Sequence, residues 1–478
     1  MSRFGEYLKF LLEKNGETVS GIAKKSGVER TSLHRAISGE RNLSYKSLKK
    51  IEEYLCLTTQ EAQILREYHN MQIQGKDVYE IRNAIVRMLN SIRPGLAGQN
   101  NAFPKDTVSE HTVMPDLEKV FFCEGEIEVY MCIERMINEE IHEKDPLILI
   151  CFPQNEYFMM QLLQKIYLTY DTELEIKHII PHKLPEKYGE VSGIQDTMSL
   201  LQNAINLTIA SDGKYHSYVS YNKEIRGGAF PYYVMNSKRL LMISGNGEHK
   251  GCCISEKNVV EYNKKVFFDS LKKCPEFIQL AAYWEKGMLL NEDYININEF
   301  MLIADSIPLQ CMLPPEKTKE KLKQCGKISP ELLDQLSNIL EAVDKKEKKI
   351  HLFLTREGMK KSIISGNALQ DGINQMISLT KEEQRACLRS LISRMSEGVI
   401  TVRLLNESQI QIGKGIYVCI ADERFVDIIF KGSNDQFYNC RIKNVYILKA
   451  FCDFAKFLPR SEDVLSEKDA LRFFEGLL

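Results

Sequence analysis

Residues 18–43 read TVSGIAKKSGVERTSLHRAISGERNL, two short helical patterns separated by a single glycine, Gly27. Ile22 and Ala23 fall on the inner side of the first pattern, and the second pattern also repeats apolar residues at helical spacing. The small side chain of Ala23 allows two helices to cross closely, and Gly27 can adopt the positive φ of a tight turn. This spacing predicts a helix-turn-helix motif.

The outward positions of the second helix carry side chains that can donate hydrogen bonds to base edges or phosphates. They are Arg30, Thr31, Ser32, His34 and Arg35. Residues 18–50 contain eight Lys or Arg against two Glu, a local charge of +6, whereas the whole chain carries −2. The positive field is therefore local to this segment, as a phosphate-binding face requires.

Further helical patterns flank this motif. One runs from Phe4 to a stop at Asn15-Gly16, one can be capped by Ser44, and one opens at Thr58. Five short helices within residues 1–70, with GERNLS after the second motif helix, resemble the Cro/phage-repressor-type (XRE family) DNA-binding domain. The resemblance implies a bacterial, cytoplasmic transcriptional regulator, and it leaves open whether the protein represses or activates.

The resemblance also implies how DNA is held. Bases are read from the start of the recognition helix, at Arg30, Thr31 and Ser32, with His34 and Arg35 on the same side. The backbone is contacted by Thr18, Ser20, Lys24, Lys25, Arg41, Asn42, Lys46 and Lys50. Many family members open the first motif helix with Gln where this chain has Val19, so Thr18 or Ser20 is expected to replace that contact. A homodimer on double-stranded DNA is expected, since twofold pairing sets half-sites roughly 34 Å apart.

The length and composition of the chain restrict the class of protein to which it can belong. At 478 residues the chain is too long for one core, and 44% hydrophobic with 27% charged residues is typical of folded globular domains. The start MSRFGE has no signal-peptide pattern, and no apolar run reaches the roughly 20 residues of a membrane span, so no membrane partner is expected. The 13 cysteines include no CxxC pair, which indicates buried thiols in a reducing compartment.

Domain boundaries follow from shifts in pattern. Residues 77–92 keep helical periodicity and predict a connecting helix within 71–93, and the Gly-, Asn- and Pro-rich stretch 94–115 reads as a linker. Beyond it we expect an α/β (or α+β) subdomain at 116–310, a helical connector at 311–345 and a second α/β subdomain at 346–478. The dimer contact is expected from the 77–92 helix or from these subdomains.

Two similar runs of helices and strands favour two copies of one α/β unit, at about 120–275 and 345–478. Apolar strands such as 147–152 and 349–355 follow helical patterns in both, whereas 256–300 is expected to return to helix. The tails CCISEKNVV and CRIKNVYIL also match loosely. The expected fold is therefore an all-α N-terminal domain followed by a duplicated α/β region.

A duplicated unit of this kind resembles the phospholipase D-like fold, whose catalytic copies carry HxK, an Asp five residues later, and GSxN. In the first copy Asn236 takes the Asp place, but Ala229 and Pro231 stand where His and Lys should be. In the second copy Asp422 fits, with Gly415 and Tyr417 in the other two places. Phosphohistidine chemistry needs an imidazole, so the resemblance implies a degenerate regulatory version.

No nucleotide-binding loop, dinucleotide GxGxxG or nucleophile elbow is present, and His178 and His182 fall on an extended run ending at Pro181. We therefore expect no catalytic residue, metal or cofactor, and no enzyme activity. A small-molecule, peptide or protein effector is expected near Arg226, Tyr232, Tyr233 and Lys238. Two alternatives remain: a DNA-tethered phospholipase D-type nuclease or phosphodiesterase, and a peptide-responsive regulator whose C-terminal part consists of helical repeats.

Overall fold

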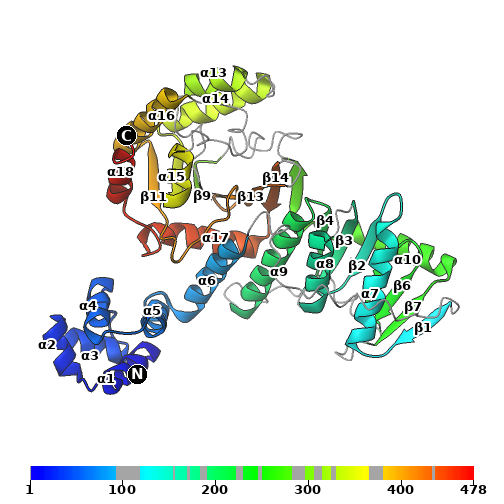
Figure 1. Cartoon of the computed structure of the whole chain (residues 1–478), viewed down its shortest axis with the longest axis horizontal. Helices are drawn as coiled ribbons and strands as arrows, with labels where there is room; N and C mark the ends of the chain where they lie inside the picture. The colour runs from blue at the N-terminus through cyan, green and yellow to red at the C-terminus, as the bar shows by residue number, and fades with distance from the viewer. Residues whose placement is uncertain are drawn as a thin grey trace. The chain divides into compact units, whose positions relative to one another are not determined.

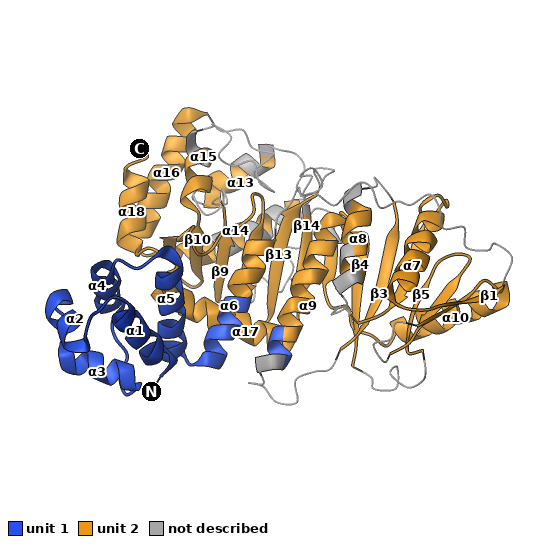
Figure 2. Ribbon diagram, turned by 60° about the horizontal axis from the view of Figure 1, so that its bottom comes forward, with its two compact units in different colours: residues 1–84, 189–195 blue, residues 85–188, 196–478 orange. Residues whose placement is uncertain are grey.

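The computed structural model describes residues 2–92, 119–153, 157–169, 173–182, 191–221, 230–245, 250–282, 297–305, 315–324, 330–364, 380–432 and 437–478. Two compact units emerge, residues 1–84 with 189–195 and residues 85–188 with 196–478 (Figure 2). The expected linker at 94–115 lies outside the described residues. No helix in the described part of the chain is both long and apolar enough to cross a membrane.

The first unit is helical. It contains α1 (Arg3–Lys14), α2 (Val19–Ser26), α3 (Arg30–Ser38), α4 (Tyr45–Leu55) and α5 (Thr59–Gln74), and its boundary with the second unit falls inside α6 (Lys76–Ser91). Ser2, Thr18 and Ser44 cap α1, α2 and α4 through their hydroxyl oxygens. Thr58 and Glu61 form a capping box at the start of α5. Polar caps thus begin four of these helices where the sequence predicts starts.

The second unit is a mixed α/β structure with two seven-stranded sheets (Figure 1). The first sheet has the order β1-β7-β6-β5-β2-β3-β4. Its strands are β1 (Val120–Cys123), β2 (Leu147–Cys151), β3 (Glu175–Pro181), β4 (Tyr215–Ser220), β5 (Tyr232–Met235), β6 (Leu240–Ile243) and β7 (Gly251–Ile254). Helices α7 (Glu126–Ile141), α8 (Tyr157–Thr169), α9 (Val191–Ala210) and α10 (Lys257–Leu271) accompany it.

The second sheet has the order β11-β10-β9-β12-β13-β14-β8. Its strands are β8 (Gln279–Ala282), β9 (Glu299–Ala304), β10 (Lys349–Leu354), β11 (Ile400–Leu404), β12 (Tyr417–Ala421), β13 (Phe425–Lys431) and β14 (Phe437–Ile442). The accompanying helices are α13 (Pro315–Gln324), α14 (Pro330–Asp344), α15 (Arg356–Ile364), α16 (Lys381–Ser396), α17 (Val445–Phe457) and α18 (Glu467–Glu475), with a short 3₁₀ helix at Leu458–Arg460.

Both sheets share one topology. Three parallel strands (β2, β3 and β4; β9, β10 and β11) are followed by an antiparallel run that ends at the strand earliest in the chain. The matching tails seen in the sequence correspond to β7 with α10 and to β14 with α17. Equivalent strands therefore occur in the same order and sense in the two halves, as duplication of one unit would produce.

The structure corrects two expectations for this region. Residues 256–300 do not return wholly to helix, because β8 and β9 follow α10. Both strands pair within the second sheet, so the expected boundaries at 310 and 346 cut through that sheet. The periodicity of 299–304 is that of a buried strand, and its parallel partner β10 lies 50 residues later. An all-helical C-terminal part is excluded by the two sheets.

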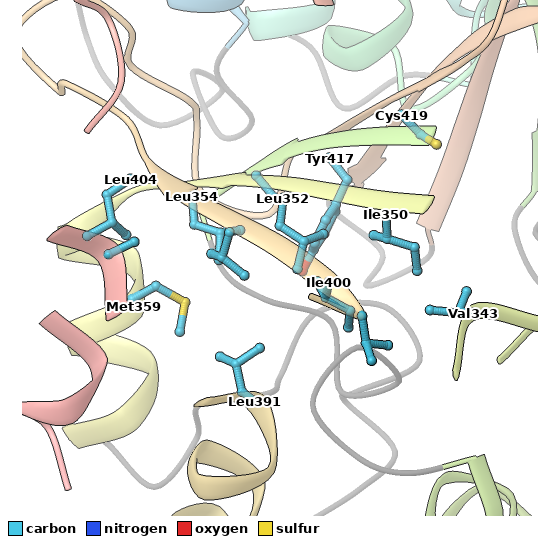
Figure 3. Close-up of a cluster of buried hydrophobic side chains, with 14 of the residues drawn as sticks. Val343, Ile350, Leu352, Leu354, Met359, Leu391, Ile400, Leu404, Tyr417 and Cys419 are labelled. Carbon is cyan, nitrogen blue, oxygen red and sulfur yellow. The ribbon is translucent and has the colours of Figure 1, made fainter. Parts of the chain in front are cut away.

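The second sheet is buried against its helices through one apolar cluster (Figure 3). Leu352 and Leu354 of β10 point into it beside Leu404 of β11 and Leu391 of α16. All four side chains are at most 1% exposed. The alternation of buried residues along β11 and the four-residue spacing of α16 produce this contact.

Candidate nucleic-acid interface

The turn between α2 and α3 has the backbone that the sequence predicts. Gly27 ends α2 in the left-handed conformation with φ 67°. Ile22 and Ala23 on α2 and Leu33 on α3 are buried in one cluster with the other apolar residues of this unit. The two helices therefore pack through the predicted inner sides, and this leaves the opposite side of α3 exposed.

Four of the five expected base-reading side chains lie on that exposed side: Arg30, Thr31, His34 and Arg35. Ser32 differs, because it is half-buried and its hydroxyl donates to a carboxylate oxygen of Glu29 at 2.8 Å. Arg30, His34 and Arg35 take part in no ion pair within the described residues. The start of α3 thus presents three nitrogen-bearing side chains and a threonine to solvent.

The position of α3 is set by contacts at its other end. A β-carbon on Gly5 of α1 would lie 2.0 Å from the carbonyl oxygen of Ile37, so α1 crosses α3 at backbone contact. Gln72 of α5 donates from Nε2 to the carbonyl oxygen of Ala36 at 3.1 Å. Neither residue was expected from the sequence. The available signal was that Gly5 falls within the apolar stripe of α1. Both act by positioning α3.

The loop after α3 carries two expected backbone contacts, Arg41 and Asn42, and both are exposed. The loop opens at Gly39, whose φ is 89°, and closes at Leu43, whose carbonyl oxygen accepts from Nε2 of His69 at 3.0 Å. His69 is fully buried on α5, and this burial lowers its pKa. A buried histidine four residues after buried Leu65 therefore ties the loop to the core.

The other expected backbone contacts divide into two groups. Ser20, Lys24, Lys46 and Lys50 are exposed, as is Lys49, which was not included in the expected set. Thr18 is also exposed, but its hydroxyl oxygen accepts the α2 cap bond from the Gly21 amide at 3.0 Å. Its remaining capacity is the hydroxyl proton, which a phosphate oxygen could accept.

Lys25 lies in a different environment from its neighbour Lys24. Its ammonium group forms an ion pair with Glu17 and lies 5.3 Å from the ring centroid of Tyr54. The hydrogen bond with Glu17 is the main cause that raises the pKa of Lys25. The charge that Lys25 could offer to a phosphate is therefore already shared with a carboxylate, whereas that of Lys24 is not.

Three of the four expected effector residues are described, and they lie in separate environments. Arg226 lies outside the described residues. Tyr232 and Tyr233 are adjacent on β5 and so point to opposite faces: Tyr232 packs on Phe152, and Tyr233 packs on Phe267. Lys238 lies beyond the other end of β5, where it pairs with Glu143 at 2.7 Å.

The two hairpins compared with the phospholipase D-like motif hold their central polar residues differently. Asn236 is buried, donates to the carbonyl oxygen of Met136 at 2.9 Å, and accepts from the amides of Lys238 and Arg239. Asp422 is exposed in a turn with φ 46°. Asn236 is thus held both by the turn and by α7, whereas Asp422 is exposed to solvent.

The two histidines at 178 and 182 occupy separate environments. His178 is fully buried in β3, donating from Nε2 to the carbonyl oxygen of Phe152 and accepting at Nδ1 from the Tyr215 hydroxyl, each at 2.8 Å. Burial lowers the pKa of His178 to about 4. His182 lies 3.0 Å from the Thr197 hydroxyl. In the part of the chain that is described, no group of three His, Cys, Asp or Glu is arranged to hold a metal ion.

No family model and no curated protein matches the chain. Among solved structures, it is similar to TrmBL2, an archaeal chromatin protein with a novel mode of DNA binding, at 12% identity and TM-score 0.24, over 35% of this chain and 57% of that one. It is also similar to phosphatidylserine synthase from Haemophilus influenzae, at 10% identity and TM-score 0.26, over 75% and 91% of the two chains. It is similar as well to polyphosphate kinase from Porphyromonas gingivalis, at 10% identity and TM-score 0.22, over 75% of this chain and 55% of that one.

The last two structures are enzymes by title. The expectation that this chain has no enzyme activity is therefore not carried further.

Proposed function

We propose that residues 1–70 are a helix-turn-helix domain that reads double-stranded DNA, and that the protein is a homodimeric transcriptional regulator. The second unit would then supply sensing, dimerisation or both. The single observation that carries this proposal is the exposed start of α3, where Arg30, His34 and Arg35 are free of ion pairs among the described residues. Guanidinium and imidazole groups so arranged can donate to base edges in a major groove.

The charge around α3 supports the same proposal. Lys24, Arg41, Lys46, Lys49 and Lys50 are exposed. Lys14 and Lys25 pair with Glu61 and Glu17. The field around α3 thus comes from cations that share their charge with no carboxylate of the described residues, and such cations release counterions from DNA on binding.

The test is selection of genomic DNA fragments by the full-length protein at two salt concentrations. A twofold-symmetric enriched motif, bound at least ~10³-fold more tightly than random DNA, is the expected result. Arg30→Ala should weaken the enrichment and relax base preference at one position of the motif, whereas Lys9→Ala, which removes one charge from an exposed position on α1, should leave the motif unchanged. Uniform binding without a motif would overturn sequence-specific reading. Shortened fragments after incubation would assign a phosphodiesterase activity instead.

A further inference from the structure

Three cysteines far apart in the sequence meet at the edge of the first sheet. The β1–β7 register places Phe121 opposite Cys253 and Cys123 opposite Gly251, so Cys123 and Cys253 share one face as diagonal neighbours. Helix α7 covers this face, because a β-carbon on Gly251 would lie 3.2 Å from Cγ2 of Val129. Cys132 follows Val129 on the buried side of α7. The labels β1, β7 and α7 locate this corner in Figure 1.

All three side chains are at most 2% exposed, and all three are free thiols. The thiol of Cys132 interacts with the thiols of both Cys123 and Cys253. The three do not have an arrangement suited to a metal ion, since no metal-holding group occurs among the described residues. The contact can therefore support thiol chemistry between the three sulfur atoms.

We propose that Cys132 and Cys253 form a peroxide-reactive pair that closes into an intramolecular disulfide. The thiolate of Cys253 attacks one oxygen of hydrogen peroxide, the O–O bond breaks, and Cys253 sulfenic acid and hydroxide form. The thiol of Cys132 then attacks the sulfenic sulfur, the S–O bond breaks, and a disulfide and water form. Both sulfurs are oxidised and one peroxide is reduced to water and hydroxide.

The assignment of Cys253 as the attacking group rests on Arg239, which ends the hydrogen-bonded turn before β6. The hydrogen bond with Cys132, and then the Arg239 guanidinium beside the Cys253 sulfur, lower the pKa of Cys253 and outweigh burial and the Glu139 carboxylate, which raise it. Arg239 is itself held by Glu139 of α7, with Nε 3.0 Å from a carboxylate oxygen. A cation fixed next to a thiol favours the thiolate, which is the nucleophile.

Access to this buried pair comes through β1. It is a strand of four residues at the sheet edge, and among the described residues it pairs only with β7. Short edge strands open locally at low cost in free energy, and hydrogen peroxide is as small as a water dimer. Local opening of β1 therefore admits the oxidant without unfolding the sheet.

The experiment uses the full-length chain with Cys56→Ser, which removes an exposed cysteine able to link two molecules. The protein is treated with hydrogen peroxide, remaining thiols are blocked with N-ethylmaleimide, and the unreduced digest is analysed by mass spectrometry. A dithiothreitol-sensitive peptide linking residues 132 and 253 is expected, forming at least ~10-fold faster than oxidation of buried Cys440. The linked peptide should disappear in Cys132→Ser and persist in the matched buried-thiol control Cys452→Ser.

Three results would overturn the proposal. The first is full N-ethylmaleimide labelling of all three thiols after denaturation of the treated protein. The second is a 123–132 link in place of the 132–253 link. The third is stoichiometric zinc that protects all three thiols in the untreated protein. The linked peptide is detected in a chain that keeps all three clustered cysteines, so the test does not depend on the folding of Cys132→Ser. The test is also independent of DNA binding.

Discussion

The Cα of Gly5 approaches the carbonyl oxygen of Ile37 so closely that a β-carbon on residue 5 would lie 2.0 Å from it. The N-terminal helix thereby fixes the end of the helix whose start carries the expected DNA-reading side chains. Backbone atoms cannot yield as a flexible side chain does, so this contact admits only glycine.

Gly5→Ala is therefore expected to push α1 away from α3 and destabilise the first unit by about 1–3 kcal/mol. Hydrogen exchange should speed up in residues 3–74, and DNA affinity should fall with it. Gly21→Ala is the control, because the closest atom to its new β-carbon is the terminal Oε2 of Glu17 at 2.9 Å, which can move. Equal exchange in the two variants would show that the crossing of α1 and α3 is not tight.

Arg30→Ala should cost about 1–3 kcal/mol of binding to the selected motif and relax the base preference at one position, as loss of an Arg–guanine pair does. Titration of labelled duplexes carrying each base at each position measures both effects. An equal loss on motif and random DNA would reassign Arg30 to the phosphate backbone.

Lys24→Ala and Lys25→Ala compare two adjacent lysines, both of which the sequence predicts to contact the DNA backbone. Lys24 is exposed without an ion pair among the described residues, whereas Lys25 pairs with Glu17. We expect Lys24→Ala to weaken all duplexes alike and to reduce the slope of log affinity against log salt by about 1. Lys25→Ala should change that slope by less than half as much. A larger effect at Lys25 would mean that its pair with Glu17 opens on DNA.

His178 should make the second unit sensitive to acid. Its pKa is lowered from 6.5 to about 4 by burial, so the unfolded chain binds the proton more readily than the folded chain. The free energy of unfolding therefore falls as pH drops through 6.5 and levels off below about 4, a total loss of about 3 kcal/mol. Urea midpoints from circular dichroism at pH 7.5 and 5.0 measure it. His178→Gln should lower the midpoint at pH 7.5 and narrow the difference between the two pH values; an unchanged difference would assign the acid sensitivity elsewhere.

Asp427 and Arg441 form a buried pair between β13 and β14, at 0% and 2% exposure. Two guanidinium nitrogens each lie 2.8 Å from a carboxylate oxygen. Arg441→Met leaves a buried carboxylate without its cation, which should cost about 3–5 kcal/mol. The double variant Asp427→Leu/Arg441→Met should be more stable than Arg441→Met alone. A double-mutant cycle by urea unfolding checks this, and simple additivity would contradict it.

Local sequence patterns predicted much of the first unit. Apolar residues every three or four positions, with a hydroxyl before each of α2, α4 and α5, predicted those helices and their buried sides. The same reasoning placed α7, α14, β2 and β10 closely. These features depend on neighbours within a few residues, so they are readable along the chain.

The short and distant pairings were not readable in this way. β1, β7, β8, β9 and β14 were not predicted as strands. Four-residue strands such as β1, β7 and β8 carry little periodicity, and β9 pairs with strands far along the chain. The sequence also did not show that Tyr232 and Tyr233, two of the expected effector residues, point to opposite faces of β5.

The sequence alone predicts the helical first unit with its exposed cationic α3, and the order of central strands that recurs in the second unit. It could do so because helix and strand periods are local properties of the chain. The folded chain alone shows that Lys25 is paired with Glu17, that Gly5 lies against the backbone of α3, and that cysteines from β1, α7 and β7 meet. Each of these depends on a contact between separate elements, and no spacing along the chain encodes such a contact.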